Sequence, residues 1–189
     1  NTAAMKPGSL VAVIGCGGVG INSIQGAAHC GAQKIIALDL LDEKLALATQ
    51  FGATHTVNSA ASDCVAKVIE LSEGRGVDYV FVTVGAKSAI EQSLSLLAKG
   101  GTAVIVGMPA SGVMAQYDPA SFAAMGQRLI GSKMGSASVK RDIPLLVKLY
   151  QEGTLKLDEL ISGRYALEDI NDAIASVQRG EALRNVVIF

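Results

Sequence analysis

Short apolar runs alternate with longer amphipathic segments along most of this chain. The runs are rich in Val, Ile, Leu and Ala, and they predict strands at 10–14, 34–38, 55–57, 78–84, 102–106 and 128–132. The segments between them place apolar residues at helical spacing, which predicts helices over 19–30, 42–51, 62–72 and 87–97. Strands that alternate with helices are typical of βαβ units and of a parallel sheet buried on both faces.

The last third of the chain has a different pattern. A polar stretch at 109–119 leads to the sixth strand, and an exposed helix is expected at 142–151. Shorter elements follow at 155–159 and 164–166, then a helix at 167–179 and a strand at 185–189. Asp42 is expected to cap the second helix, and Gly31 and Gly52 to end the first and second helices.

A glycine-rich run, Gly15-Cys16-Gly17-Gly18-Val19-Gly20, follows the first predicted strand and opens the first predicted helix. In this setting Gly15 permits the tight turn, Gly17 lets a pyrophosphate approach the backbone, and Gly20 lets the helix pack closely on the strand. The alternative is a glycine turn with no ligand. We expect a dinucleotide-binding α/β fold of the Rossmann type, with a doubly wound parallel sheet of six strands.

Asp39 ends the second predicted strand and strengthens this expectation. A carboxylate at this place accepts hydrogen bonds from both ribose hydroxyls of NAD. Leu40 and Leu41 follow it, without an arginine for a 2′-phosphate, so NAD is favoured over NADP. The alternative for Asp39 is an acidic residue that merely begins a loop.

Charge and cysteine content exclude several other classes of function. The 189 residues carry 16 basic and 17 acidic side chains, a net charge of −1 that does not suggest nucleic acid or an anionic membrane as a partner. The three cysteines, Cys16, Cys30 and Cys64, are widely spaced, so neither a disulfide framework nor a zinc site made by this chain alone is expected. A low-pKa thiol at Cys16 is a minor alternative. Without a long apolar window or a secretory signal, we expect a cytoplasmic protein.

The sequence resembles the coenzyme-binding half of the zinc-dependent, medium-chain alcohol dehydrogenases over essentially its whole length. The resemblance is carried by the glycine run, by Asp39 followed by Lys44, and by Phe-Gly-Ala-Thr at 51–54, Gly-Val-Asp at 76–78, Val-Gly-Met-Pro at 106–109 and the tail segments at 165–173 and 180–189. It implies a Rossmann domain over 6–133 and a C-terminal part over 134–189 that packs toward a catalytic domain. Residue 1 is not Met and residues 1–5 look like the last turn of a helix, so we expect the chain to be a fragment of a longer protein.

The resemblance also implies roles for individual residues. Gly17, Gly18 and Val19 would line the pyrophosphate, with Arg184 reaching it from the tail, and Asp39 and Lys44 would hold the adenosine ribose. The strand ends would supply the remaining contacts: Thr83, Val84 and Gly85 on the adenine side, Val106 and Met108 on the nicotinamide side, and the backbone of Ser132 and Met134 at the carboxamide. The alternatives are a solvated charge for Lys44 and Arg184, and core packing for Met108 and Met134.

The zinc ligands and the catalytic residues of the family lie in a segment that precedes this one, and no position of this chain matches them. The resemblance therefore implies an alcohol or aldehyde substrate, NAD, and zinc held outside these residues. The edge strand at 128–132 is expected to pair with a second copy and form a homodimer. Two rivals are a zinc-free quinone reductase, against which Gly15, Gly17 and Asp39 argue, and a non-catalytic dinucleotide-binding module.

Overall fold

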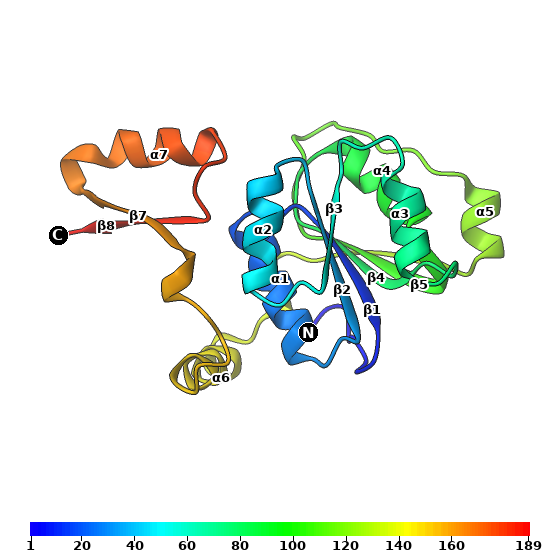
Figure 1. Cartoon of the computed structure of the whole chain (residues 1–189), viewed down its shortest axis with the longest axis horizontal. Helices are drawn as coiled ribbons and strands as arrows, with labels where there is room; N and C mark the ends of the chain where they lie inside the picture. The colour runs from blue at the N-terminus through cyan, green and yellow to red at the C-terminus, as the bar shows by residue number, and fades with distance from the viewer. The chain divides into compact units, whose positions relative to one another are not determined.

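Six parallel strands form one sheet in the order β3-β2-β1-β4-β5-β6 (Figure 1). The computed structural model describes all residues 1–189 and divides into two compact units, Asn1–Ala137 and Ser138–Phe189. The sheet belongs to the first unit. Its strands are β1 (Leu10–Ile14), β2 (Lys34–Asp39), β3 (His55–Asn58), β4 (Val77–Val82), β5 (Leu97–Ile105) and β6 (Arg128–Gly131).

Helices cover both faces of this sheet (Figure 1). On one side lie α1 (Gly18–His29) and α2 (Asp42–Gln50), and on the other lie α3 (Cys64–Leu71), α4 (Lys87–Ser95) and α5 (Pro119–Ala124). The two sides follow from the handedness of parallel crossovers, because the chain first moves outward from β1 to β3 and then returns to β4 and continues to β6. The strand order reverses between β1 and β4, and this point is where open α/β sheets bind ligands.

The core explains why the central strands are continuously apolar. Every residue of β1 is buried, and Val11 and Val13 have no exposed surface. Ile21 and Ile24 of α1 are equally buried. Each such side chain contributes about 1.5–3 kcal/mol relative to exposure. The predicted α/β class and the doubly wound sheet of six parallel strands are confirmed.

Three local expectations in the first unit are wrong. Residues 1–5 form a turn in which the Ala4 N–H donates to Asn1 O (3.1 Å), and they are not helical. Strand β5 begins at Leu97 instead of 102, because the β4–β5 register shifts between Val77 and Tyr79 and leaves room for extra residues. Asp42 is the first residue of α2 and does not cap it; its carboxylate accepts a hydrogen bond from Asn58 Nδ2 (2.7 Å).

Helix α5 lies outside the elements that the apolar pattern predicts. It has six residues and none of them is buried, so it lacks the apolar stripe that reveals a helix in a sequence. Its start is nevertheless marked: Asp118 Oδ1 accepts the N–H of Ala120 (3.0 Å), and Pro119 occupies the first turn. These two residues are the signal that could have identified the helix.

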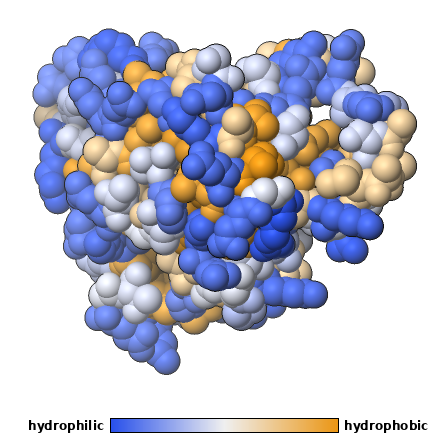
Figure 2. Space-filling view, turned by 45° about the vertical axis from the view of Figure 1, so that its right-hand side comes forward, coloured by the Kyte–Doolittle hydropathy of each residue, from blue (hydrophilic) through white to orange (hydrophobic).

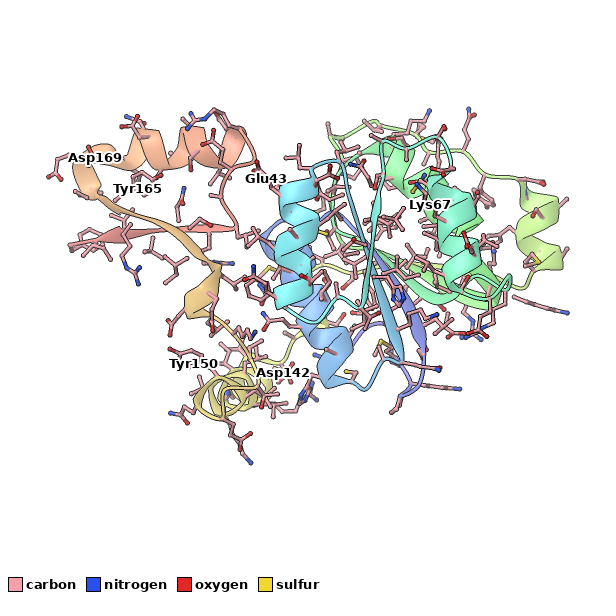
Figure 3. All side chains as sticks on the ribbon, viewed as in Figure 1. Glu43, Lys67, Asp142, Tyr150, Tyr165 and Asp169 are labelled. Atoms are coloured by element: carbon pink, nitrogen blue, oxygen red, sulfur yellow. The ribbon has the colours of Figure 1, made fainter.

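The second unit contains helix α6 (Val139–Gln151) and a small βαβ arrangement. Strands β7 (Ile161–Ala166) and β8 (Arg184–Ile188) pair in parallel, and α7 (Ile170–Gln178) connects them after a 3-10 turn at Leu167–Asp169. Another 3-10 turn, Asp158–Leu160, precedes β7. Tyr150, labelled on α6 in Figure 3, donates its hydroxyl hydrogen to Asp158 Oδ2 (2.7 Å).

The boundaries in the second unit differ from the expected ones by a few residues. Helix α6 starts at Val139, three residues early, because the Asp142 carboxylate accepts the N–H of Ser138 (2.8 Å) and closes the first turn. Strand β7 starts at Ile161, before the expected 164.

Figure 2 shows apolar residues in orange among the polar ones on the molecular surface. None of the helices has both the length and the apolar character needed to cross a bilayer.

Candidate functional site

The loop after β1 needs glycine at its first position. Gly15 has φ +94°, and a Cβ there would lie 2.4 Å from Val84 Cγ1. The Gly15 N–H donates to Leu38 O (2.7 Å), so the loop leaves β1 while still bonded to β2. Neither the backbone conformation nor the space permits a side chain.

Gly20 is required for a different reason, the contact between α1 and the loop. A Cβ at Gly20 would lie 1.7 Å from the carbonyl oxygen of Gly15. Thr83, which follows β4, donates its hydroxyl hydrogen to this same oxygen (2.8 Å) or to Ile14 O (3.0 Å). The glycine loop is therefore clamped between the first turn of α1 and the end of β4.

Gly17 has no such constraint within the protein. It precedes α1 with φ −73° and ψ −172°, a conformation open to any residue, and a Cβ there would have no neighbour within 4 Å. No side chain caps the helix, so its first N–H groups lack a side-chain acceptor. The open space over an uncapped helix start fits the diphosphate of a dinucleotide, which needs close approach to backbone N–H groups. Val19, in this first turn, is 54% exposed.

The Asp39 carboxylate is fixed beside the glycine loop. Its Oδ2 accepts the N–H of Cys16 (2.7 Å), and its Oδ1 accepts the N–H of Leu41 (3.1 Å). These bonds hold the acid between the end of β2 and the loop, where a ribose joined to a bound diphosphate would lie. Lys44, half-buried in the first turn of α2, is close enough to Cys16 to affect its titration.

Cys16 is excluded as a reactive thiol. Burial, and then the negative charge of Asp39, raise the pKa of the Cys16 thiol to about 12, against a smaller opposing effect of Lys44. The thiol is protonated at neutral pH, whereas reactive cysteines are thiolates.

The ends of β4 and β5 are packed against each other without room for side chains. A Cβ at Gly107 would lie 2.3 Å from the carbonyl carbon of Val84, and a Cβ at Gly85 would lie 2.5 Å from Met108 O. The N–H groups of Val106 and Gly107 both point to Val82 O (2.9 Å each). Gly107 is a structural residue of the site that the sequence reasoning missed, although it lies within the Val-Gly-Met-Pro segment.

Two methionines, for which cofactor contact and core packing were the alternatives, lie on the surface. Met108 is 76% exposed and Met134 is 86% exposed, which excludes core packing. Ser132 continues the edge of the sheet, since its N–H donates to Ile105 O (2.8 Å). Met134 then begins a turn of three successive residues with positive φ.

The predicted site residues of the first unit therefore all lie at or after the carboxyl ends of β1, β2, β4, β5 and β6. Arg184 is an exposed residue at the start of β8 in the second unit, and its contact with a pyrophosphate stays a prediction. No group of three or more His, Cys, Asp or Glu side chains that could hold a metal ion comes together in the chain.

Comparison with known proteins agrees with this architecture. A model of the family described as zinc-binding dehydrogenase matches residues 18–152. The NDMA-dependent alcohol dehydrogenase of Amycolatopsis methanolica is 36% identical over 187 residues, which cover 97% of this chain and 50% of that enzyme. The chain thus spans about half the length of the curated relatives it matches.

Solved structures give the same result. Benzyl alcohol dehydrogenase from Acinetobacter calcoaceticus superimposes with a TM-score of 0.95 at 35% identity, over 99% of this chain and 51% of that one. A zinc-binding dehydrogenase from Sinorhizobium meliloti 1021, bound to NADP, has a TM-score of 0.83 at 31% identity, over 92% of this chain and 50% of that one. This chain belongs to the zinc-binding dehydrogenase family, in which it corresponds to the C-terminal, coenzyme-binding part.

Proposed function

We propose that this chain binds NAD as the coenzyme-binding half of an alcohol dehydrogenase that transfers a hydride between an alcohol and NAD⁺. The observation that carries the proposal is the 2.7 Å hydrogen bond from the Cys16 N–H to Asp39 Oδ2. It joins a ribose-binding acid to the glycine loop, the two parts that a dinucleotide site needs in fixed relation.

Different groups of the chain bind different parts of the cofactor. The uncapped N–H groups at Gly18 and Val19 face the diphosphate, and the open space at Gly17 lets it approach. Each oxygen of Asp39 uses one lone pair on a backbone N–H and keeps another for a ribose hydroxyl. Lys44 contributes a positive charge next to the same ribose.

The strand ends on the other side of the switch point orient the two rings. Thr83, Val84 and Gly85 flank the adenine side, and Val106 and Met108 flank the nicotinamide side, whose carboxamide meets the backbone of Ser132 and Met134. Arg184 contacts the pyrophosphate from the C-terminal part. Bound NAD supplies the nicotinamide ring that exchanges the hydride. The surrounding protein groups bind that ring and orient it.

The remaining parts of the reaction are proposed to lie outside these residues. The substrate is an alcohol or aldehyde, and zinc is held by residues in the part of the relatives that this chain does not span. We also propose a cytoplasmic protein that forms a homodimer through β6, an edge strand whose Leu129 is exposed.

The choice of NAD over NADP rests on charge. The Asp39 carboxylate would repel a 2′-phosphate, and Leu40, which follows it, is 65% exposed and offers no cation. The relative from Sinorhizobium meliloti was solved with NADP, so the opposite preference is a real alternative.

Calorimetric titration of the 189-residue chain with each cofactor decides between NAD and NADP. We expect NAD to bind at least about tenfold more tightly, a difference of about 1.4 kcal/mol; equal affinities, or no binding of either, would contradict the proposal.

A further inference from the structure

The segment that follows β6 is strained. Met134, Gly135 and Ser136 have φ values of +54°, +63° and +50°, and two of these three residues carry side chains. Left-handed conformations of residues other than glycine persist only where surrounding contacts hold them, and they cluster at ligand sites. The backbone bonds of the turn itself are long, 3.3 Å for both Ser136 N–H to Lys133 O and Ala137 N–H to Met134 O.

One side chain from the other end of the first unit bridges this strained segment. The Oγ1 atom of Thr2 lies 3.2 Å from Ser132 Oγ and 2.8 Å from Ser136 Oγ. A hydroxyl donates one hydrogen and accepts others, so Thr2 can serve both serines at once, as donor to one and acceptor from the other. Because Ser132 precedes the left-handed turn and Ser136 is its last residue, Thr2 fixes the distance across it.

The N-terminal segment that carries Thr2 is itself anchored. The Gly8 N–H donates to Gly31 O (2.7 Å), and the Ser9 hydroxyl donates to Lys6 O (2.6 Å). A third bond, from the Ala4 N–H to Asn1 O, closes a turn around Thr2. Thr2 is therefore presented from a defined backbone and can restrain the turn.

We infer that Thr2 is a positioning residue for the nicotinamide end of the cofactor site. This inference rests on the proposed function, in which the backbone of Ser132 and Met134 meets the carboxamide. Thr2 does not touch the cofactor. It holds the Ser132–Ser136 segment in the left-handed turn, so that these backbone groups face the carboxamide before NAD arrives.

The inference separates the two ends of the cofactor, and this makes it testable with two ligands. ADP-ribose has the adenosine and the diphosphate of NAD but no nicotinamide. Thr2→Val keeps the shape of the side chain and removes the hydroxyl, whereas Thr2→Ser keeps the hydroxyl and is the matched control. Calorimetric titration should show NAD binding weakened about three- to tenfold in Thr2→Val, as expected for the loss of one or two hydrogen bonds. ADP-ribose binding should be unchanged, and Thr2→Ser should bind both ligands like the parent chain.

A second variant keeps the inference testable if Thr2→Val does not fold. Ser136→Ala removes the partner at 2.8 Å and should weaken NAD alone by a similar factor. Because Thr2→Val already breaks the contact with Ser136, Thr2→Val combined with Ser136→Ala should weaken NAD binding no more than Thr2→Val alone. Thermal melting verifies that each variant is folded, and Ser136→Ala carries the test if Thr2→Val is not.

The outcomes distinguish this inference from the proposed function. If the parent chain binds neither NAD nor ADP-ribose, the proposed function fails and the role of Thr2 fails with it. If the parent chain binds both, and the Thr2→Val change weakens both ligands equally or neither of them, NAD binding stands and the positioning role is refuted.

Discussion

Gly17 precedes α1 and Gly20 lies in its first turn, three positions later, and we expect their replacement to have opposite effects. Packing within the protein requires glycine at Gly20, since a Cβ there would lie 1.7 Å from Gly15 O. At Gly17 a Cβ would touch nothing within 4 Å, so packing does not require glycine there, and the proposed approach of a diphosphate is the reason that we infer for it. Replacing each by alanine should therefore separate the stability of the fold from the binding of NAD.

For Gly20→Ala, the new Cβ and the Gly15 oxygen must separate by more than about 1 Å before they reach an ordinary contact, and that oxygen belongs to backbone that the Thr83 hydroxyl holds by a hydrogen bond. Overpacking of this kind costs about 3 kcal/mol. For a chain of this length, such a loss lowers the melting temperature by about 6–12 °C.

For Gly17→Ala, two small effects cancel. Alanine is a poorer residue than glycine before a helix, by about 0.5 kcal/mol. It also restricts the unfolded chain, which returns about 0.4–1 kcal/mol. The melting temperature should change by less than about 2 °C, whereas NAD affinity should fall at least about tenfold because the methyl group occupies the space of the diphosphate.

Calorimetry and thermal melting of the two variants test both halves of this reasoning. NAD binding by Gly17→Ala with unchanged affinity would show that no diphosphate lies over the start of α1. A melting temperature of Gly17→Ala as low as that of Gly20→Ala would show that the space at Gly17 is not open.

Three further predictions concern specificity, assembly and pH. Asp39→Gly combined with Leu40→Arg should shift the ratio of NAD to NADP affinity toward NADP, because it removes a repelling carboxylate and adds a cation; an unchanged ratio in titrations would remove Asp39 from the ribose site. Leu129→Pro should give monomers in sedimentation. The Ser132 N–H points to β5 and N–H directions alternate along a strand, so the Leu129 N–H points to the free edge, where proline removes this donor. A variant that stays dimeric would place the interface elsewhere. Burial opposes ionisation of Asp78, but Arg75 and the Leu10 N–H hold the pKa of Asp78 below 3.8. Asp78→Asn should therefore be less stable than the parent at neutral pH, and the gap in melting temperature should narrow as pH falls below about 4; a constant gap would contradict this account.

The sequence was most informative where one physical requirement controls one residue. The positions of the strands, the loop glycines and the position of Asp39 follow from apolar runs and from the spacing of the dinucleotide-binding motif. The sequence was least informative where contacts between residues distant in the chain determine the structure. Nothing local in Thr2 or Ser136 indicates that their hydroxyl groups meet, because 134 positions separate them. The reason for glycine at Gly107 lies in the backbone of β4, and the start of β5 at Leu97 depends on the register of its partner strand.

The buried thiol of Cys16 gives this chain an internal reporter of loop opening. Its sulfur is inaccessible, and its pKa of about 12 keeps it from reacting in the closed loop. Alkylation of Cys16 therefore requires the glycine loop to separate from Asp39, whereas the exposed Cys30 is available throughout. The ratio of the two labelling rates measures how often the loop opens. A ligand that occupies the loop will slow the labelling of Cys16 while that of Cys30 stays constant, so binding can be followed by mass spectrometry without a substrate or an enzymatic assay.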